Sequence, residues 1–261
     1  MAIALAHHEF GAGEPLVILH GLFGSGRNWQ AIAKRLADSY RVYTVDLRNH
    51  GRSPWSPTMT FAEMVEDLKT FLDRHDLQRA IILGHSVGGK TAMAFTLEHP
   101  ERTAALIVVD IAPVAYDHTF LPLVEAMQAV DLRGLKRRAE VEARLAETIP
   151  DTPTRKFLIQ NLVAKGHGHG LKWRINLDAI GGAMSELTGF PDEKEHEYEG
   201  RVLFISGQRS DYIAREHHDP IFALFPQSEF AVIPDAGHRV HAEQPDAFLD
   251  SVVTFLESAY A

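Results

Sequence analysis

The sequence predicts an α/β fold in which a mostly parallel, doubly wound sheet carries an inserted helical cap. Two observations lead to this prediction. In the first part of the chain, short apolar runs alternate with amphipathic stretches, which is the pattern of buried parallel strands joined by helices. After Pro113 that alternation stops, and strand-like runs return only from Val202 onward. A regular strand-helix alternation favours a parallel sheet with helices on both faces.

The first half supplies the strands and helices that alternate. Runs of branched aliphatic residues indicate the strands, and apolar residues spaced three and four apart indicate the helices. Thr60 directly precedes one such helix and is its expected N-cap. The expected strands span residues 16–19, 41–45, 80–83 and 104–109, and the expected helices span residues 29–36, 61–72 and 88–98.

The stretch from Tyr116 to Glu199 shows helical patterns only, separated by proline and glycine. Its expected helices span residues 120–130, 138–148, 154–164 and 175–187. Sheet patterns resume at residues 202–205 and 230–233, and a helix over residues 245–257 closes the chain. We therefore expect a core of residues 1–113 and 200–261. A helical cap of residues 114–199 should cover the carboxyl ends of the strands, where open α/β sheets bind ligands.

Composition excludes several classes of protein. Lys and Arg number 26 against 35 Asp and Glu, a formal net charge of −9 over 261 residues, which argues against a nucleic-acid-binding protein because these need a concentrated basic face. The lack of cysteine rules out disulfides, thiolate nucleophiles and cysteine-ligated metals. Residues 1–10 show no signal-peptide pattern, and no apolar run approaches the roughly 20 residues of a membrane span. We expect a cytoplasmic protein without a membrane span.

Ser86 is the candidate nucleophile. It is the central residue of a G-x-S-x-G motif, Gly84 to Gly88, placed between an expected strand and an expected helix. Chemistry at such a site needs a sharp turn, in which the glycines allow close backbone approach and the serine hydroxyl is forced outward at the start of the helix. The alternative is that Ser86 merely caps the helix.

A serine hydroxyl is a weak nucleophile and needs a base from elsewhere in the chain. His238, one of 15 histidines, follows the last expected strand and precedes the last helix. It lies 152 residues after Ser86, so the base would follow the nucleophile in the chain. His241 stands three residues further on, at the approach to a helix, and is the weaker candidate because that position suits support of the loop.

Two carboxylates stand at strand ends and could orient the imidazole. Asp110 follows the strand after the Ser86 turn, and Asp211 follows the strand at residues 202–205. From the residues alone both remain candidates, since Asp110 could instead form a turn before Pro113 and Asp211 could be a surface carboxylate.

The Ser86 segment also matches the phosphate-loop pattern G-x-x-x-x-G-K-[ST]. The matching residues are Gly84, Gly89, Lys90 and Thr91. Such a loop normally follows the first strand of its domain and needs an acidic strand end to hold magnesium, and it would leave His238 without a role. Nucleotide hydrolysis is therefore disfavoured.

Four sequence blocks resemble the α/β-hydrolase family over essentially the whole chain. They are His20–Gly24, Asp46–Ser53, Gly84–Gly89, and Gly237-His238 with Glu243-Gln244-Pro245. A narrower resemblance, to bacterial carboxylesterases and thioesterases with a helical cap, rests on three further features. These are Gly88-Gly89-Lys90, Val109–Pro113 and Ser210.

The resemblance implies roles for specific residues. In the bacterial subgroup the acid follows the earlier strand and a serine occupies the later loop, which implies Asp110 as the acid and Ser210 as an additional hydrogen-bonding partner. Most α/β-hydrolases place the acid on the later loop, so Asp211 remains the alternative. The backbone N–H groups of Leu22 and Val87 are the implied oxyanion-hole donors.

The implied function is a serine esterase that hydrolyses carboxylic esters, with acyl thioesters as a second substrate class, through a Ser-His-Asp triad and an acyl-enzyme. No cofactor or metal is expected, and His167 and His169 lie in a glycine-rich stretch without a nearby carboxylate. The expected partner is a small-molecule ester, and the oligomeric state is not predicted. Alternatives on the same fold are a carbon-carbon bond hydrolase, a menaquinone-pathway lyase-type synthase, a haloperoxidase or acyltransferase, and a non-catalytic small-molecule receptor.

The cap is expected to shape an apolar acyl pocket. The candidate lining residues, each of which could instead belong to the core of the cap, are Phe120, Leu123, Met127, Trp173, Ile180 and Met184.

Overall fold

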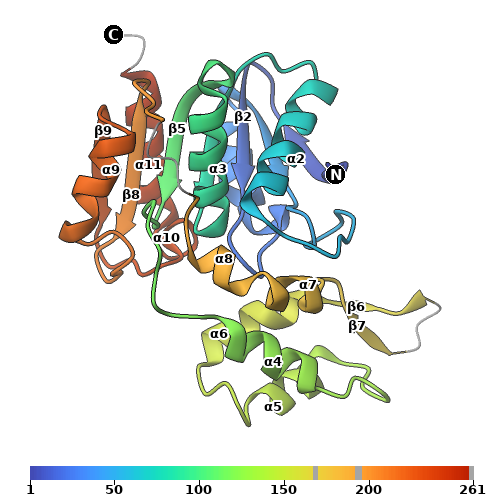
Figure 1. Cartoon of the computed structure of the whole chain (residues 1–261). Helices are drawn as coiled ribbons and strands as arrows, with labels where there is room; N and C mark the ends of the chain where they lie inside the picture. Colours follow the sequence, from blue (N-terminus) through green and yellow to red (C-terminus); the bar gives the residue numbers. More distant parts are fainter. Residues whose placement is uncertain (167–169, 192–195, 259–261) are drawn as a thin grey trace.

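A seven-stranded sheet runs through the centre of the molecule (Figure 1). The computed structural model describes residues 1–166, 170–191 and 196–258. Within these residues the strand order is β1-β3-β2-β4-β5-β8-β9, and β1 alone runs antiparallel to its neighbour. The strands are β1 (His7–Phe10), β2 (Glu14–Leu19), β3 (Tyr40–Val45), β4 (Ala80–His85), β5 (Thr103–Val109), β8 (Val202–Gly207) and β9 (Ser228–Ile233).

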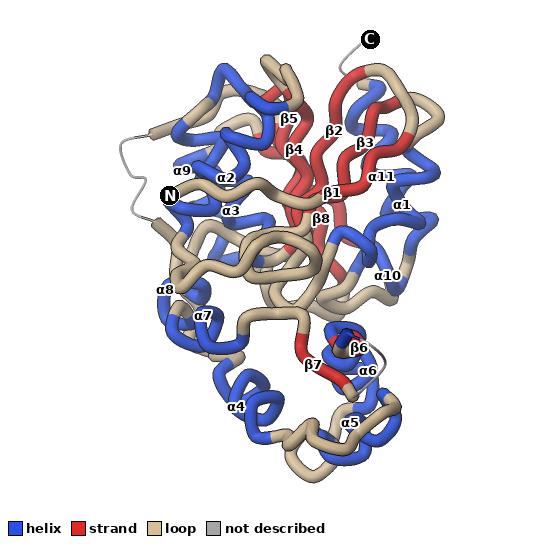
Figure 2. Tube along the Cα trace, turned by 90° about the vertical axis from the view of Figure 1, so that its right-hand side faces the viewer, coloured by secondary structure: helices blue, strands red, loops and turns tan. Residues whose placement is uncertain are grey.

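Helices cover both faces of the sheet (Figure 2). Along β2, Leu16 and Ile18 pack in one apolar cluster with α1 and α11, whereas Val17 and Leu19 pack in another with α2 and α3. Because both faces are covered, the strand reads as a continuous apolar run, and the predicted doubly wound arrangement is confirmed. The helices around the sheet are α1 (Gln30–Leu36), α2 (Phe61–Arg74), α3 (Val87–Glu98), α9 (His218–Leu224), α10 (Val240–Glu243) and α11 (Pro245–Glu257).

The strand register aligns the loops that form the site. Leu19 pairs with Gly84, His85 with Val109, and Val109 with Ile205. The loops that follow β2, β4, β5 and β8 therefore leave the sheet side by side at its carboxyl edge, the position at which open α/β sheets bind ligands.

Most expected elements appear within a few residues of their predicted bounds, and Thr60 caps α2 by accepting a hydrogen bond from Glu63 N at 3.2 Å. Outside the insertion, three of the strands and helices named above were not expected from the sequence, namely β1, α9 and α10. The edge strand β1 pairs antiparallel with β3, although its residues include His7 and His8 and carry no aliphatic run. Helix α9 is a short helix whose residues are largely exposed or half-buried, so its periodicity is weak.

Residues 114–199, called the insertion below, lie beyond the carboxyl ends of β5 and β8 (Figure 1). The insertion contains helices, as predicted, but residues 162–164, expected at the end of a helix, form strand β6 (Leu162–Ala164), which pairs antiparallel with β7 (Leu171–Trp173) in a hairpin. Its other elements are α4 (Leu121–Ala129), α5 (Arg138–Leu145), α6 (Thr152–Leu158), the 3₁₀ turn η3 (Ile159–Asn161), α7 (Leu177–Gly182) and α8 (Met184–Thr188). His167 and His169 fall outside the described residues.

The helices of the described ranges include none that combines the length and the apolar character required to cross a membrane. The assignment of residues 114–199 as a cap and of the remainder as a core stays a prediction.

Arg48 anchors the loop after β3. Its guanidinium is fully buried, with Nε 2.7 Å from Asp67 Oδ2 on α2 and Nη1 2.8 Å from Glu63 Oε2. Removing such charges from water is costly, and the cost is offset only while each charge keeps its partners. The loop thus depends on buried ion pairs with two carboxylates of α2.

Asp67→Ala should lower the free energy of unfolding by about 3–5 kcal/mol, because it leaves a buried guanidinium with incomplete compensation. Asp246→Ala, which removes the solvent-exposed pair of Asp246 with Arg35, is the control and should cost less than about 1 kcal/mol. Urea denaturation of both variants gives the comparison. Small and equal losses would contradict the structural role of the Arg48 pair.

Candidate active site

Ser86 lies in a sharp turn between β4 and α3. Its backbone φ is +53°, which residues with side chains rarely adopt. The turn is possible because Gly84 and Gly88 carry no Cβ. A Cβ on Gly84 would collide with the Gly88 carbonyl oxygen, and a Cβ on Gly88 would lie 2.5 Å from the His20 carbonyl oxygen. Val87, the first residue of α3, has an N–H that needs no intrahelical partner. The sequence motif therefore forms the strained turn that presents the serine at a helix N-terminus.

Asp110 and His238 form a hydrogen-bonded pair at the same edge of the sheet. Asp110 directly follows β5, is 0% exposed and has a φ of +54°. His238 Nδ1 lies 2.7 Å from Asp110 Oδ2. Because an ionised carboxylate only accepts hydrogen bonds, Nδ1 carries the proton and Nε2 keeps its lone pair.

Two further donors hold the Asp110 carboxylate. Ser210 Oγ donates to Oδ2 at 2.5 Å, and the Gly207 N–H donates to Oδ1 at 3.1 Å. Asp211, the alternative acid, is exposed and lines the wall of a cavity in front of His238. The structure thus places Asp110, rather than Asp211, in hydrogen-bond contact with the imidazole.

The loop that carries His238 is tied to the Ser86 turn by His85. The His85 Nε2–H donates to the His238 carbonyl oxygen at 2.8 Å, and their ring centroids lie 4.7 Å apart. Burial holds the pKa of His85 well below its usual value, so this donor is a neutral imidazole. Tyr212 also stacks on the His238 ring, with centroids 4.1 Å apart. A side chain at the end of β4 and one in the loop after β8 therefore fix the position of His238.

His241, the alternative base, packs against Trp29 and His85, whereas the hydrogen bond to Asp110 is made by His238. It is buried and stacks on Trp29 with ring centroids 3.8 Å apart. Burial lowers the pKa of His241 to about 3. These contacts suit support of the loop.

Two histidines fix the loop after β2. The His20 Nδ1–H donates to the Gly21 carbonyl oxygen at 2.8 Å, and His50 Nε2 accepts from the Phe23 N–H at 3.2 Å. The Gly21 carbonyl belongs to the same planar peptide as the Leu22 N–H, so a hydrogen bond to the first fixes the direction of the second. Within the described chain, no hydrogen bond engages the Leu22 N–H. This donor is therefore oriented and free to bind a ligand.

Two neighbouring cavities meet at the site. The larger, of about 410 Å³, is lined by His238 and Ser210, and Ser86 lies in the wall of the smaller. Tyr116, His118 and Tyr212 line both cavities. The Tyr212 hydroxyl lies 2.9 Å from His118 Nε2, which joins the loops after β5 and β8. These three aromatic side chains thus form the common wall of the site.

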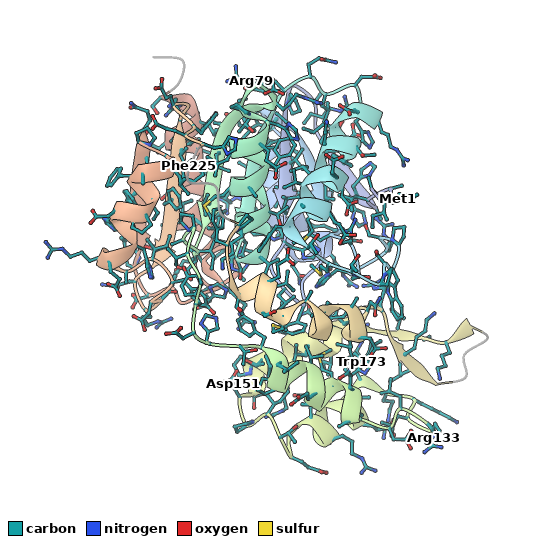
Figure 3. The ribbon with its side chains drawn as sticks, viewed as in Figure 1. Met1, Arg79, Arg133, Asp151, Trp173 and Phe225 are labelled. Atoms are coloured by element: carbon teal, nitrogen blue, oxygen red, sulfur yellow. The ribbon has the colours of Figure 1, made fainter. Side chains whose placement is uncertain are left out.

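Of the residues expected to line an acyl pocket, Phe120 lies beside Ser86. The others pack into the apolar cluster that joins the insertion to the sheet: Leu123, Met127, Trp173, Ile180 and Met184. Figure 3 shows Trp173 among the side chains of the insertion, where its Nε1–H donates to the Met127 carbonyl oxygen on α4 at 3.1 Å.

Lys90 joins the helix of Ser86 to the insertion. Its Nζ donates to the carbonyl oxygens of Thr188 at 2.8 Å and Gly189 at 2.5 Å, and it lies 4.8 Å from the centroid of the Tyr116 ring. Loss of hydration lowers the pKa of Lys90 to about 7. Lys90 is the lysine of the phosphate-loop pattern, and here it binds carbonyl oxygens of the insertion.

Sequence analysis did not identify His85, Tyr212 or His118 as parts of the site. His85 occupies a variable position of the G-x-S-x-G motif, and only the position of Tyr212 near Ser210 could have indicated its role. Arg48 binds α2, Asn49 Nδ2 donates to Thr58 O, and His50 binds the loop after β2.

Acidification should destabilise the fold through the buried histidines. Burial lowers the pKa of His50 and His241 to about 3 from the usual 6.5. As the pH falls from 6.5 toward 3, the unfolded chain binds protons that the folded chain excludes, so stability is full above pH 6.5 and falls below it. Each histidine contributes a slope of about 1.4 kcal/mol per pH unit.

His241→Phe keeps the stacking on Trp29 and removes one titrating group, so it should reduce that slope by about 1.4 kcal/mol per pH unit. Urea denaturation at pH values between about 4 and 7 measures the slope. An unchanged slope in the variant would contradict a buried neutral His241.

Gly88→Ala should destabilise the protein by at least about 2 kcal/mol, because the new methyl group meets backbone carbonyls that cannot move aside. Gly182→Ala is the control, since nothing lies within 4 Å of a Cβ there, and it should be neutral or stabilising by about 0.5–1 kcal/mol. Thermal unfolding compares the two. Equal melting temperatures would argue against close packing of α3 on β2.

Comparisons with known proteins agree with this geometry. The family model for the alpha/beta hydrolase fold matches residues 14–245. The sn-1-specific diacylglycerol lipase ABHD11 of Danio rerio is 39% identical over 255 residues, covering 95% of this chain and 80% of the relative. Esterase YbfF of Escherichia coli (strain K12) is 34% identical over 243 residues, covering 93% and 92%.

A solved structure described as a marine microorganism esterase superposes with a TM-score of 0.94 at 38% identity, covering 97% of this chain and 100% of that one. Both the fold predicted from the sequence and the resemblance to bacterial esterases are thereby confirmed. The chain belongs to the α/β-hydrolase family.

Proposed function

We propose that the protein is a serine esterase of the carboxylesterase type, in which Ser86, His238 and Asp110 act as the triad. The observation that carries the proposal is the hydrogen bond of 2.7 Å between His238 Nδ1 and the buried Asp110 carboxylate, in a loop tied by His85 to the Ser86 turn. The lipase and esterase relatives support ester hydrolysis as the reaction class.

Acylation begins with the free lone pair on His238 Nε2. Ser86 Oγ forms a bond to the ester carbonyl carbon while its proton passes to Nε2, and the carbonyl electron pair moves onto oxygen. The imidazolium that forms is stabilised by the Asp110 carboxylate, which its own hydrogen bonds hold in place. Collapse of the tetrahedral intermediate breaks the bond to the leaving-group oxygen, which receives the proton from Nε2.

The N–H groups of Leu22 and Val87 donate hydrogen bonds to the negatively charged oxygen of the intermediate and stabilise it. The Leu22 peptide is oriented in advance by the hydrogen bond of His20 to the Gly21 oxygen, so the donor needs no reorganisation when charge develops. Water then attacks the acyl-enzyme with His238 as base, which releases the acid and restores Ser86. Ser210 is a positioning residue that acts through Asp110.

The insertion serves as a cap that bounds the acyl pocket, with Phe120 beside the nucleophile. A thiolate leaving group would follow the same steps as an alkoxide, so acyl thioesters belong to the same proposal. The substrate is a small molecule bound at the carboxyl edge of the sheet.

Hydrolysis of p-nitrophenyl esters from acetate to palmitate tests this function. Wild type should be active, and Ser86→Ala should reduce kcat by at least about 10⁴-fold because no nucleophile remains. Asp110→Asn should cost about 10⁴-fold, since an amide favours the wrong imidazole tautomer. Asp211→Asn is the matched control and should be nearly silent.

Ser210→Ala should reduce kcat by about tenfold, through loss of one charge-assisted hydrogen bond to Asp110.

A larger loss in Asp211→Asn than in Asp110→Asn would reverse the assignment of the acid. A wild-type protein inert toward every ester would reject simple esterase activity in favour of the carbon-carbon bond hydrolase, lyase or receptor alternatives.

A further inference from the structure

Three arginines line a cavity between the insertion and the loop after β2. The cavity has a volume of about 310 Å³, and its wall includes Arg27 beside Phe23, with Arg138 and Arg174 from the insertion. The side chains that line it include no carboxylate. In a chain of net charge −9, this is a local concentration of positive charge.

The arginines are not neutralised within the described part of the chain. Arg138 donates to the Leu162 carbonyl oxygen at 2.9 Å, and none of the three forms an ion pair with a described residue. The Arg174 Nε is buried without a hydrogen-bond partner there. By contrast, Arg35 and Arg48 each pair with an aspartate. An unpaired buried guanidinium N–H is costly unless a ligand accepts from it.

Hydrogen bonds across the two sides hold the cavity in shape. Asn28 Nδ2 donates to Gln160 Oε1 at 2.8 Å, and Asn161 Nδ2 donates to the Phe23 carbonyl oxygen at 2.8 Å. The Arg174 N–H donates to the Asn161 carbonyl oxygen at 2.8 Å. The backbone segments that carry the arginines are therefore fixed relative to one another, although the side chains of Arg27 and Arg138 are exposed.

The rings of Phe23 and Phe120 lie between this cavity and the cavity of Ser86. Phe23 lines it and directly follows Leu22, whose N–H is the assigned oxyanion donor. The Phe23 ring meets the Phe120 ring edge-on at a centroid distance of 6.4 Å, and Phe120 lies in the wall of the Ser86 cavity. A substrate group held by the arginines would therefore be separated from the Ser86 cavity by this one ring pair.

We propose that this cavity binds an anionic oxygen group, phosphate or carboxylate, carried by the ester or thioester substrate. The proposal rests on the proposed esterase function and narrows its substrates to those with a negative group away from the scissile bond. Guanidinium groups suit this task because their planar donors match both oxyanions in bidentate geometry.

Four substrates test the site in two matched pairs. Butyryl-coenzyme A and S-butyrylpantetheine share a thioester and the pantetheine arm, and only the first carries the phosphorylated adenosine. The mono-p-nitrophenyl ester of glutaric acid and p-nitrophenyl valerate share an ester and differ in a carboxylate. The variants are Arg27→Gln and Arg174→Gln, with Arg133→Gln as control, because Arg133 lies on the outer surface of the insertion and pairs with Asp131 (Figure 3).

Each cavity variant should raise KM for the anionic member of one pair by about tenfold, with kcat and the neutral member unchanged. Arg133→Gln should change neither. An effect confined to the coenzyme A pair identifies phosphate as the anion, and one confined to the glutarate pair identifies carboxylate. Equal behaviour of both members of both pairs in every variant would overturn the proposal while esterase function stands.

If wild type hydrolyses none of the four substrates, the proposed function fails, and the arginine site is then judged by calorimetric titration with inorganic pyrophosphate. Binding that is lost in Arg174→Gln supports the site. Binding that is absent in wild type, or unchanged in the variant, overturns it.

Discussion

The carboxylate of Asp110 is the point on which the arrangement of the site depends. It is fully buried at the end of β5, and it accepts hydrogen bonds from the Gly207 N–H, the Ser210 hydroxyl and His238 Nδ1. These donors come from the end of β8, the loop after it and the loop after β9. A buried charge is tolerated only when it is well compensated, so the requirement to satisfy one carboxylate draws separate loops to one place.

Much of the fold could be predicted because it follows from burial. Strands covered on both faces are apolar along most of their length. For this reason β2, β4, β5 and β8 could be predicted from the sequence. The missed elements lack that signal. Strand β1 is an edge strand of polar and half-buried residues, and the β6–β7 hairpin consists of three-residue strands whose pairing depends on tertiary contacts.

The residues of the candidate site also differ in whether a local sequence pattern indicates them. Ser86 and His238 could be found because a nucleophile turn and a terminal histidine loop have local patterns. The choice of Asp110 over Asp211 rested on the resemblance carried by Ser210, and the hydrogen bond of His238 to Asp110 agrees with it. His85, His20 and His50 act through neutral imidazoles that hydrogen-bond to backbone groups, and a single sequence carries no pattern for such contacts. The arginine cavity joins residues more than a hundred positions apart, Arg27 and Arg174, which only the packing of the insertion brings together.

The backbone at the site is set apart from that of the sheet by its conformation. Ser86, Asp110 and Phe23 all have positive φ although none is glycine. Each such residue costs of order 1–3 kcal/mol, and the cost persists only where surrounding structure over-determines the conformation. The apolar sheet therefore both positions the loops and supplies the free energy that offsets their backbone strain. Part of its folding free energy is consumed in keeping a few residues away from their preferred shapes, so the protein is less stable than its core alone would make it.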